Sequence, residues 1–197
     1  MERRGKMRDR LFVVLLCAGL VAIVGSPGLA DRTSLHDEND AYGPLDVKRM
    51  SHSHGTDEGD VVHLVAMYGK WDQNTLESAD SDIQLLFTTD GDNQPERVLV
   101  IDAEGNSIRA DMHKWNKGVG KKSFGRAALE RSGPRAVKVV FEKSLLGRKV
   151  SEYGWHVDTR FHDEDHSRCN VSDGVIVVCP DSAPNDDSPR SYLRHKL

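Results

Sequence analysis

Residues 153–162 read YGWHVDTRFH, a run in which apolar and polar side chains alternate. Successive side chains of a β-strand point to opposite faces of the sheet, so this run predicts a strand with a core face and an outer face. The core face would carry Trp155, Val157, Thr159 and Phe161. The outer face would carry His156, Asp158, Arg160 and His162.

Other short apolar runs lie on both sides of this one, separated by turn sequences such as Asp90-Gly91 and Gly133-Pro134. They are rich in the β-branched and aromatic residues that half-buried strands favour. The expected strands cover 45–51, 61–71, 83–88, 97–102, 108–115, 125–130, 136–142, 153–162 and 175–179. About nine short strands at this spacing predict an all-β protein, an antiparallel β-sandwich, with helical turns only at 74–81 and 144–148.

The amino terminus has the pattern of an export signal. Five basic residues among the first ten precede an apolar run over 11–24, and the small residues Gly28 and Ala30 follow. This run suits a signal-peptide core and is shorter than the ~20 residues that span a bilayer. We expect cleavage after Ala30 and a secreted, extracellular chain with no membrane span. The alternative is a retained membrane anchor.

After the signal peptide at 1–30, we expect a flexible leader at 31–44, a sandwich domain at 45–185 and a C-terminal tail at 186–197. The whole chain has 27 Lys and Arg against 31 Asp and Glu, a net charge of −4. Beyond the first ten residues the balance is 22 basic against 29 acidic. A nucleic-acid partner would need clustered positive charge, so we expect none.

Cysteine usage agrees with export. Cys17 lies in the signal, which leaves Cys169 and Cys179 in the exported chain. Two cysteines in an oxidising compartment predict a disulfide, worth about 3 kcal/mol for so short a loop. The alternative is a metal pair, although no CxxC spacing supports it. Asn170-Val171-Ser172 also fits the N-glycosylation pattern, whose use depends on the host.

An acidic turn lies between two expected strands, at residues 89–96 with the sequence TDGDNQPE. Its candidate calcium ligands are Asp90, Asp92, Asn93 and Glu96. Carboxylate and amide oxygens two residues apart in a turn can converge on a hard cation. The spacing is not that of an EF-hand, which would need an acid where Thr88 lies. The alternative is a tight acidic hairpin, because Asp-Gly is a strong turn signal.

Histidines form a second candidate metal site. His52 and His54 would share one side of a strand, and His162 and His166 flank an acidic tripeptide. If these segments met in the fold, the four side chains could bind zinc or copper. The alternative is a set of exposed histidines in a polar secreted protein.

We expect that the protein is not an enzyme. The sequence has no Gly-x-Ser-x-Gly elbow, no His-Glu-x-x-His motif and no glycine-rich phosphate loop. A pair of acids for glycoside hydrolysis is not readable from sequence, since their separation is spatial.

Several segments resemble a secreted bacterial β-sandwich domain of uncharacterised exported proteins, over most of residues 45–185. They are LDVKRMSH at 45–52, YGKW at 68–71, LFTTDGD at 86–92, VVFEKSLLG at 139–147, Tyr153-x-Trp155, and CPDSAPN at 179–185. The chain is also loosely similar to family 9 carbohydrate-binding modules, where a strand ends in an acidic Asp-Gly turn and a late strand leads into a short Leu-Gly segment. This likeness implies a jelly-roll-like sandwich, a structural calcium and sugar binding on aromatic platforms.

Three functional hypotheses follow. The first is a secreted non-catalytic binding module for surface polysaccharide or protein, with Trp71 and Trp115 near strand ends as stacking platforms. The alternative for both tryptophans is core packing, because large aromatic side chains dominate burial. The second hypothesis is an exported metal-binding protein that uses the acidic turn or the histidines. A glycoside hydrolase-like enzyme is the third.

Overall fold

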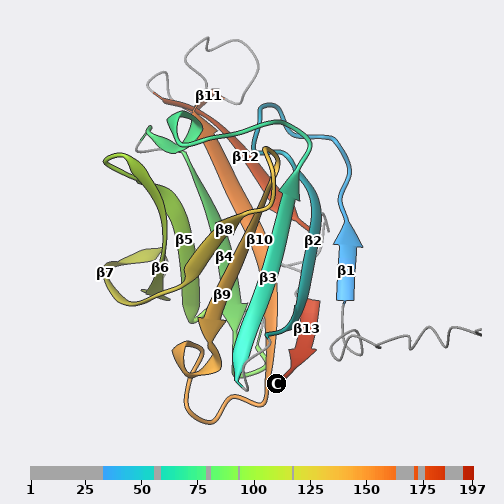
Figure 1. The fold of residues 1–197 in the computed structure, drawn as a ribbon, viewed down its shortest axis with the longest axis vertical. Coiled ribbons are helices and arrows are strands. Elements are labelled where there is room, and N and C mark those ends of the chain that lie inside the picture. The colour runs from blue at the N-terminus through green and yellow to red at the C-terminus, as the bar shows by residue number, and fades with distance from the viewer. Residues whose placement is uncertain are drawn as a thin grey trace, which may run out of the picture.

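The computed structural model describes residues 33–55, 59–78, 81–92, 94–116, 118–162, 171–172, 176–184 and 193–197. Their regular structure is β-strand, with two 3₁₀ turns. η1 (Asn74–Leu76) lies inside the predicted helical turn 74–81, and η2 (Lys143–Leu145) begins one residue before the predicted turn 144–148. The strands are β1 (Thr33–His36), β2 (Val47–His54), β3 (Asp60–Met67), β4 (Asp82–Thr88), β5 (Arg97–Glu104), β6 (Ser107–Trp115), β7 (Val119–Arg126), β8 (Ala128–Arg131), β9 (Ala136–Glu142), β10 (Glu152–His162), β11 (Val171–Ser172), β12 (Ile176–Ala183) and β13 (Leu193–Lys196). The all-β prediction is confirmed (Figure 1).

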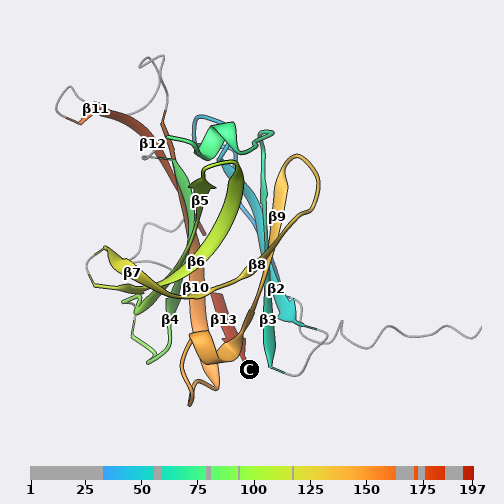
Figure 2. The same cartoon turned by 60° about the vertical axis from the view of Figure 1, so that its left-hand side comes forward.

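The strands form two antiparallel sheets that face each other across one core (Figure 2). The first sheet has the order β1-β2-β3-β9-β8. The second has the order β11-β12-β10-β4-β5-β6-β7, with β13 also paired to β10. The second sheet curves strongly toward its β6–β7 end (Figure 2). The predicted antiparallel sandwich is therefore the architecture of the described residues.

The core between the sheets follows the predicted alternation. The side chains of Trp155 and Val157 in β10 are fully buried there, and Thr159 is almost so. They meet the inward row of β4, which is Ile83, Leu85 and Phe87, and the inward row of β9, which is Val137, Val139 and Phe141. Phe161 is partly buried and packs against the edge of the same core. Strict two-residue alternation places all of these side chains on one side of their strands.

The outer face of β10 differs from the prediction, because part of it is buried as well. His156 is only 3% exposed, although it lies on the face opposite to Trp155. A small second apolar cluster lies on this outer side of the sheet. It contains Leu86, Val98 and Val100, with Trp115 packed against them. Leu86 of β4 lies directly opposite His156 in the β4–β10 register, so this apolar cluster borders the face that the alternation alone assigns to solvent.

One strand segment changes sheets at a buried alanine. The predicted strand at 125–130 divides into the end of β7 in the second sheet and the start of β8 in the first. Between them Ala127 is buried and donates its backbone N–H to the Ala110 carbonyl at 2.9 Å. The chain therefore links the two layers covalently at this edge.

The sandwich extends beyond the predicted range 45–185. Residues Thr33–His36, expected in a flexible leader, form β1 and pair with β2. Residues Leu193–Lys196, expected in a tail, form β13 and pair with β10. Both segments are short and polar, so their pairing comes from the neighbouring strand edge and not from an apolar pattern of their own. The described part of the chain therefore has thirteen strands, where about nine were expected.

The predicted signal peptide at 1–30 lies outside the described residues. Among the residues that are described, no helix has the length and apolar character needed to cross a membrane.

A core substitution tests the assignment of the two faces. Leu85→Ala should lower the free energy of unfolding by about 2–5 kcal/mol, because it opens a cavity in the fully buried core. Urea unfolding followed by tryptophan fluorescence measures the change. The matched change Val119→Ala, at a side chain that is 39% exposed, should stay within about 0.5 kcal/mol. Equal effects of the two substitutions would contradict the core assignment.

Candidate functional site

A pocket of about 410 Å³ lies on the outer side of the second sheet. Its lining includes Gln84 of β4, Trp115 at the end of β6, Asp158 and Arg160 of β10, and Ser182 of β12. Alternation along β10 brings Asp158 and Arg160 to the same face. The antiparallel register then places Ser182 opposite Asp158 and Pro180 opposite Arg160. Gly118 and Val119, at the start of β7, complete the wall beside Trp115.

Hydrogen bonds hold the polar side chains of this pocket in place. Ser182 Oγ donates to Asp158 Oδ1 at 2.7 Å, and His156 Nε2 lies 3.1 Å from the same oxygen. On the neighbouring strand, Asp82 accepts from Gln84 Nε2 at 3.0 Å and from Arg160 through two guanidinium nitrogens. Bidentate arginine–carboxylate pairs are geometrically specific. The pocket therefore presents polar groups in fixed orientations.

The two tryptophans proposed as stacking platforms occupy different environments. Trp115 is partly buried, packs on the outer apolar cluster and lines the pocket. Trp71 is only 3% exposed and belongs to the core between the sheets. The Arg131 guanidinium lies 3.4 Å from the centre of the Trp71 ring, and its Nη2 donates to the Trp71 carbonyl at 2.7 Å. The structure thus puts Trp71 in the core-packing role and Trp115 at the wall of a cavity.

The acidic turn brings together three of its four predicted ligands. Oxygens of Asp90, Asp92 and Glu96 lie within 4.8 Å of one another, while Asn93 lies outside the described residues. Asp90 Oδ1 accepts the Asp92 backbone N–H at 3.1 Å, which lowers the pKa of Asp90. Glu96 Oε2 accepts the Thr89 backbone N–H at 2.7 Å, and burial raises the Glu96 pKa. These oxygens could hold a cation, and they also close the hairpin.

Three of the four predicted histidine ligands lie in the described residues, and the structure does not bring all three together. His52 points into the core, where Trp155 Nε1 donates to its Nδ1 at 2.9 Å. His54 is exposed at the end of β2. His162 lies seven residues beyond Trp155 on β10, roughly 23 Å away along an extended strand. His166 lies outside the described residues. The structure therefore does not bring His52 and His162 together.

The described residues contain a buried cluster of three histidines, His52, His63 and His195. Among them, only His52 was a candidate from the sequence. The ring of His52 lies 4.0 Å from that of His195, and the ring of His63 lies 4.1 Å from that of Trp155, centre to centre. His63 Nε2 and Tyr153 Oη share a hydrogen bond of 3.0 Å. Complete burial, and then the neighbouring His52 and His195, hold the His63 pKa well below its ordinary value. Its place in the alternating row of β3, between Val61 and Val65, is the signal that could have revealed it.

A second group of acids was also missed. We call Asp37, Asp40, Asp46 and Asp181 the edge cluster. Asp37 follows β1, Asp40 lies in the β1–β2 connection, Asp46 precedes β2, and Asp181 comes from β12. Because more than a hundred residues separate Asp181 from the other three, no local motif could have joined them.

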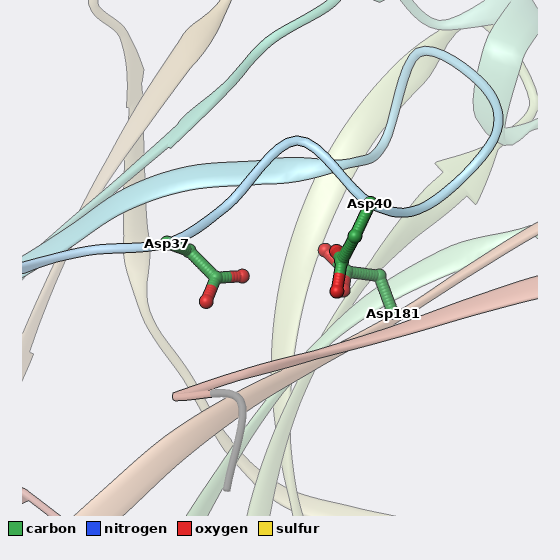
Figure 3. A group of neighbouring side chains, drawn as sticks. All are labelled: Asp37, Asp40 and Asp181. Atoms are coloured by element: carbon green, nitrogen blue, oxygen red, sulfur yellow. The ribbon is translucent and has the colours of Figure 1, made fainter.

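The geometry of the edge cluster is compact. Carboxylate oxygens of Asp37, Asp40 and Asp181 lie within 4.8 Å of one another, and their side chains converge on one point (Figure 3). Asp181 Oδ2 accepts the Val47 backbone N–H at 2.6 Å, a hydrogen bond between the two sheets. Burial, and then the charges of Asp181, Asp40 and Asp37, raise the pKa of Asp46 to about 7. The cluster thus concentrates negative charge where the two sheets meet.

Cys179 is buried in β12, and Cys169 lies outside the described residues. The disulfide between them stays a prediction.

The buried His63 predicts how stability depends on pH. Above pH 6.5 the imidazole is neutral in the folded and the unfolded chain and contributes no pH dependence. Below pH 6.5 the unfolded chain takes up a proton that the folded chain resists, so stability falls. Between pH 8 and pH 5.5 the loss from this group should be about 1 kcal/mol.

Urea unfolding at the two pH values measures this effect. His63→Gln should reduce the difference in unfolding free energy between pH 8 and pH 5.5 by about that amount. His54→Gln, at an exposed position of the neighbouring strand, should leave the difference unchanged. An undiminished pH dependence in His63→Gln would refute the assignment to His63.

Comparison with known proteins gave no match, whether to a family model, to a curated protein or to a solved structure.

Proposed function

We propose that this protein is an exported, non-catalytic binding module that holds a carbohydrate in the pocket beside Trp115. One observation carries the proposal: an indole wall and a set of fixed polar groups line the same 410 Å³ cavity. Ligand pockets of proteins commonly have volumes of ~300–1,000 Å³, with apolar walls and a few oriented polar groups. This pocket has both features.

The chemistry of the lining suits a sugar ring. A sugar has C–H groups on its faces and hydroxyl groups at its rim. The indole of Trp115 offers an apolar surface for the faces, and its flat shape suits stacking. Gln84, Asp158 and Ser182 offer donors and acceptors for the hydroxyl groups at the rim. Since Ser182 and Asp158 already bond to each other, a ligand would meet groups that need little reordering.

The arrangement of carboxylates favours binding over hydrolysis. Glycoside hydrolysis requires two carboxyl groups that face each other across the scissile bond. Asp158 and Asp181 both contribute to the pocket lining, but the β10–β12 register pairs Asp181 with the inward Thr159. The Asp181 carboxylate bonds instead to Val47 in the opposite sheet. The two acids therefore belong to opposite faces of the second sheet.

Export and an extracellular ligand are part of the same proposal. The support is the amino-terminal sequence, in which basic residues, an apolar run and small residues follow one another. Polysaccharides of the cell surface or the surroundings are then the accessible carbohydrates. A protein ligand at the same face is the alternative.

Trp115→Ala tests the proposal most directly. Affinity electrophoresis of the full chain through gels that contain one neutral soluble polysaccharide each, together with a gel without polysaccharide, measures binding. We expect at least one polysaccharide to retard the wild type. Trp115→Ala should lose the retardation, a weakening of tenfold or more, because the apolar wall of the pocket is removed.

The matched control is Phe124→Ala, which removes a 44% exposed aromatic ring of β7 outside the pocket lining. This variant should be retarded like the wild type. If both variants bind like the wild type, or if Phe124→Ala alone loses binding, the pocket is not the carbohydrate site. If no polysaccharide retards the wild type, the carbohydrate proposal fails.

A further inference from the structure

We propose that the edge cluster binds one divalent cation of the calcium class, and that this cation joins the β1–β2 connection to β12. The site is separate from the acidic turn at Asp90, which the sequence suggested for calcium. It also does not depend on the carbohydrate proposal, because the ligands and the test are different.

The first support is the spacing of the oxygens. Calcium binds oxygen ligands at about 2.3–2.6 Å, so two oxygens on opposite sides of one ion are at most about 5 Å apart. The oxygens of Asp37, Asp40 and Asp181 satisfy this limit, since all lie within 4.8 Å of one another. Asp37 and Asp40 come from the β1–β2 connection and Asp181 comes from β12, and the three carboxylates face one another (Figure 3). One ion can therefore touch all three.

The second support is the buried carboxylate of Asp46. This residue is 2% exposed, and neither of its oxygens has a hydrogen bond of normal geometry within the part of the chain that the structure describes. The Ala41 backbone N–H approaches this carboxylate without forming such a bond. Buried carboxylates are strongly disfavoured unless they are paired or bound to a metal. A cation held by Asp37, Asp40 and Asp181 would place a positive charge beside this buried carboxylate, because all three acids lie close enough to Asp46 to interact with its charge.

The composition of the cluster selects the kind of cation. All four side chains are carboxylates, and oxygen-only ligand sets suit hard cations such as calcium and magnesium. Zinc and copper prefer imidazole and thiolate ligands, which the edge cluster lacks among the described residues. Asp181 can still coordinate, because a carboxylate has about four acceptor positions and the Val47 and Ser182 amides use two.

A bound cation would close the sandwich at this edge. Asp46 directly precedes β2 in the first sheet, and Asp181 lies within β12 in the second. In the β12 segment, Ser182 lines the outer pocket while the adjacent Asp181 faces the edge cluster. The cation would add a second link between the sheets beside the Val47–Asp181 hydrogen bond.

Calcium titration of the full chain tests the inference, with isothermal titration calorimetry for stoichiometry and thermal unfolding for stability. The wild type should bind a calcium ion at the cluster, and its melting temperature should rise by several degrees in saturating calcium relative to EDTA. Asp46→Asn and Asp40→Asn should each weaken this binding tenfold or more. Asp40 is exposed, so its variant should fold normally in EDTA.

The matched control is the double variant Asp90→Asn, Asp92→Asn, which alters the acidic turn and leaves the edge cluster intact. It should keep the calcium-dependent rise that the Asp46 and Asp40 variants lose. The inference is overturned if calcium neither binds nor raises the melting temperature of the wild type. It is equally overturned if the turn variant loses the rise while Asp46→Asn and Asp40→Asn keep it, or if zinc alone stabilises the chain.

Discussion

Three buried hydrogen bonds run from the inward face of β10 to the first sheet and to the segment that leads into its strand β2, and they fix how the two layers face each other. Tyr153 bonds to His63 at 3.0 Å, Trp155 donates to His52 at 2.9 Å, and Thr159 donates to the Leu45 carbonyl at 2.8 Å. Apolar packing alone is non-directional. Buried polar groups are costly when unpaired, so a sliding of one sheet over the other would break several of these bonds at once.

Strand β10 contributes side chains to the core on one face and to the pocket on the other. β10 is paired with β4 along one side and with β12 and β13 along the other, so it lies inside the sheet. Its inward side chains from Tyr153 to Thr159 are buried between the two sheets. Its outward side chains Asp158 and Arg160 lie on the opposite face and do not belong to this core. These two side chains line the pocket together with Gln84 of β4 and Ser182 of β12. The functional proposal therefore depends on the alternation along one strand.

The alternation of apolar and polar residues predicted most of the long strands and the core face of β10. It did not predict features made by segments that are far apart in the sequence. The strands with strong apolar rows, such as β4, β9 and β10, were predicted within one or two residues of their ends. The polar strands β1 and β13 were missed, because pairing with a neighbour and not a local pattern creates them. The edge cluster was missed for a related reason, because Asp181 is more than a hundred residues away from Asp37 and Asp40 and lies near them only in the fold. The burial of His156 was missed because its neighbour Leu86 lies on another strand, far away in the sequence.

The inward face of β10 joins the two sheets through buried hydrogen bonds. Hydrogen exchange of the Trp155 indole N–H, followed by NMR, tests it most directly. The account predicts exchange only through global unfolding, with a protection free energy equal to that from urea unfolding, because this donor is fully buried against His52. Exchange at a much lower free energy, while the core amides of β4 remain protected, would contradict it.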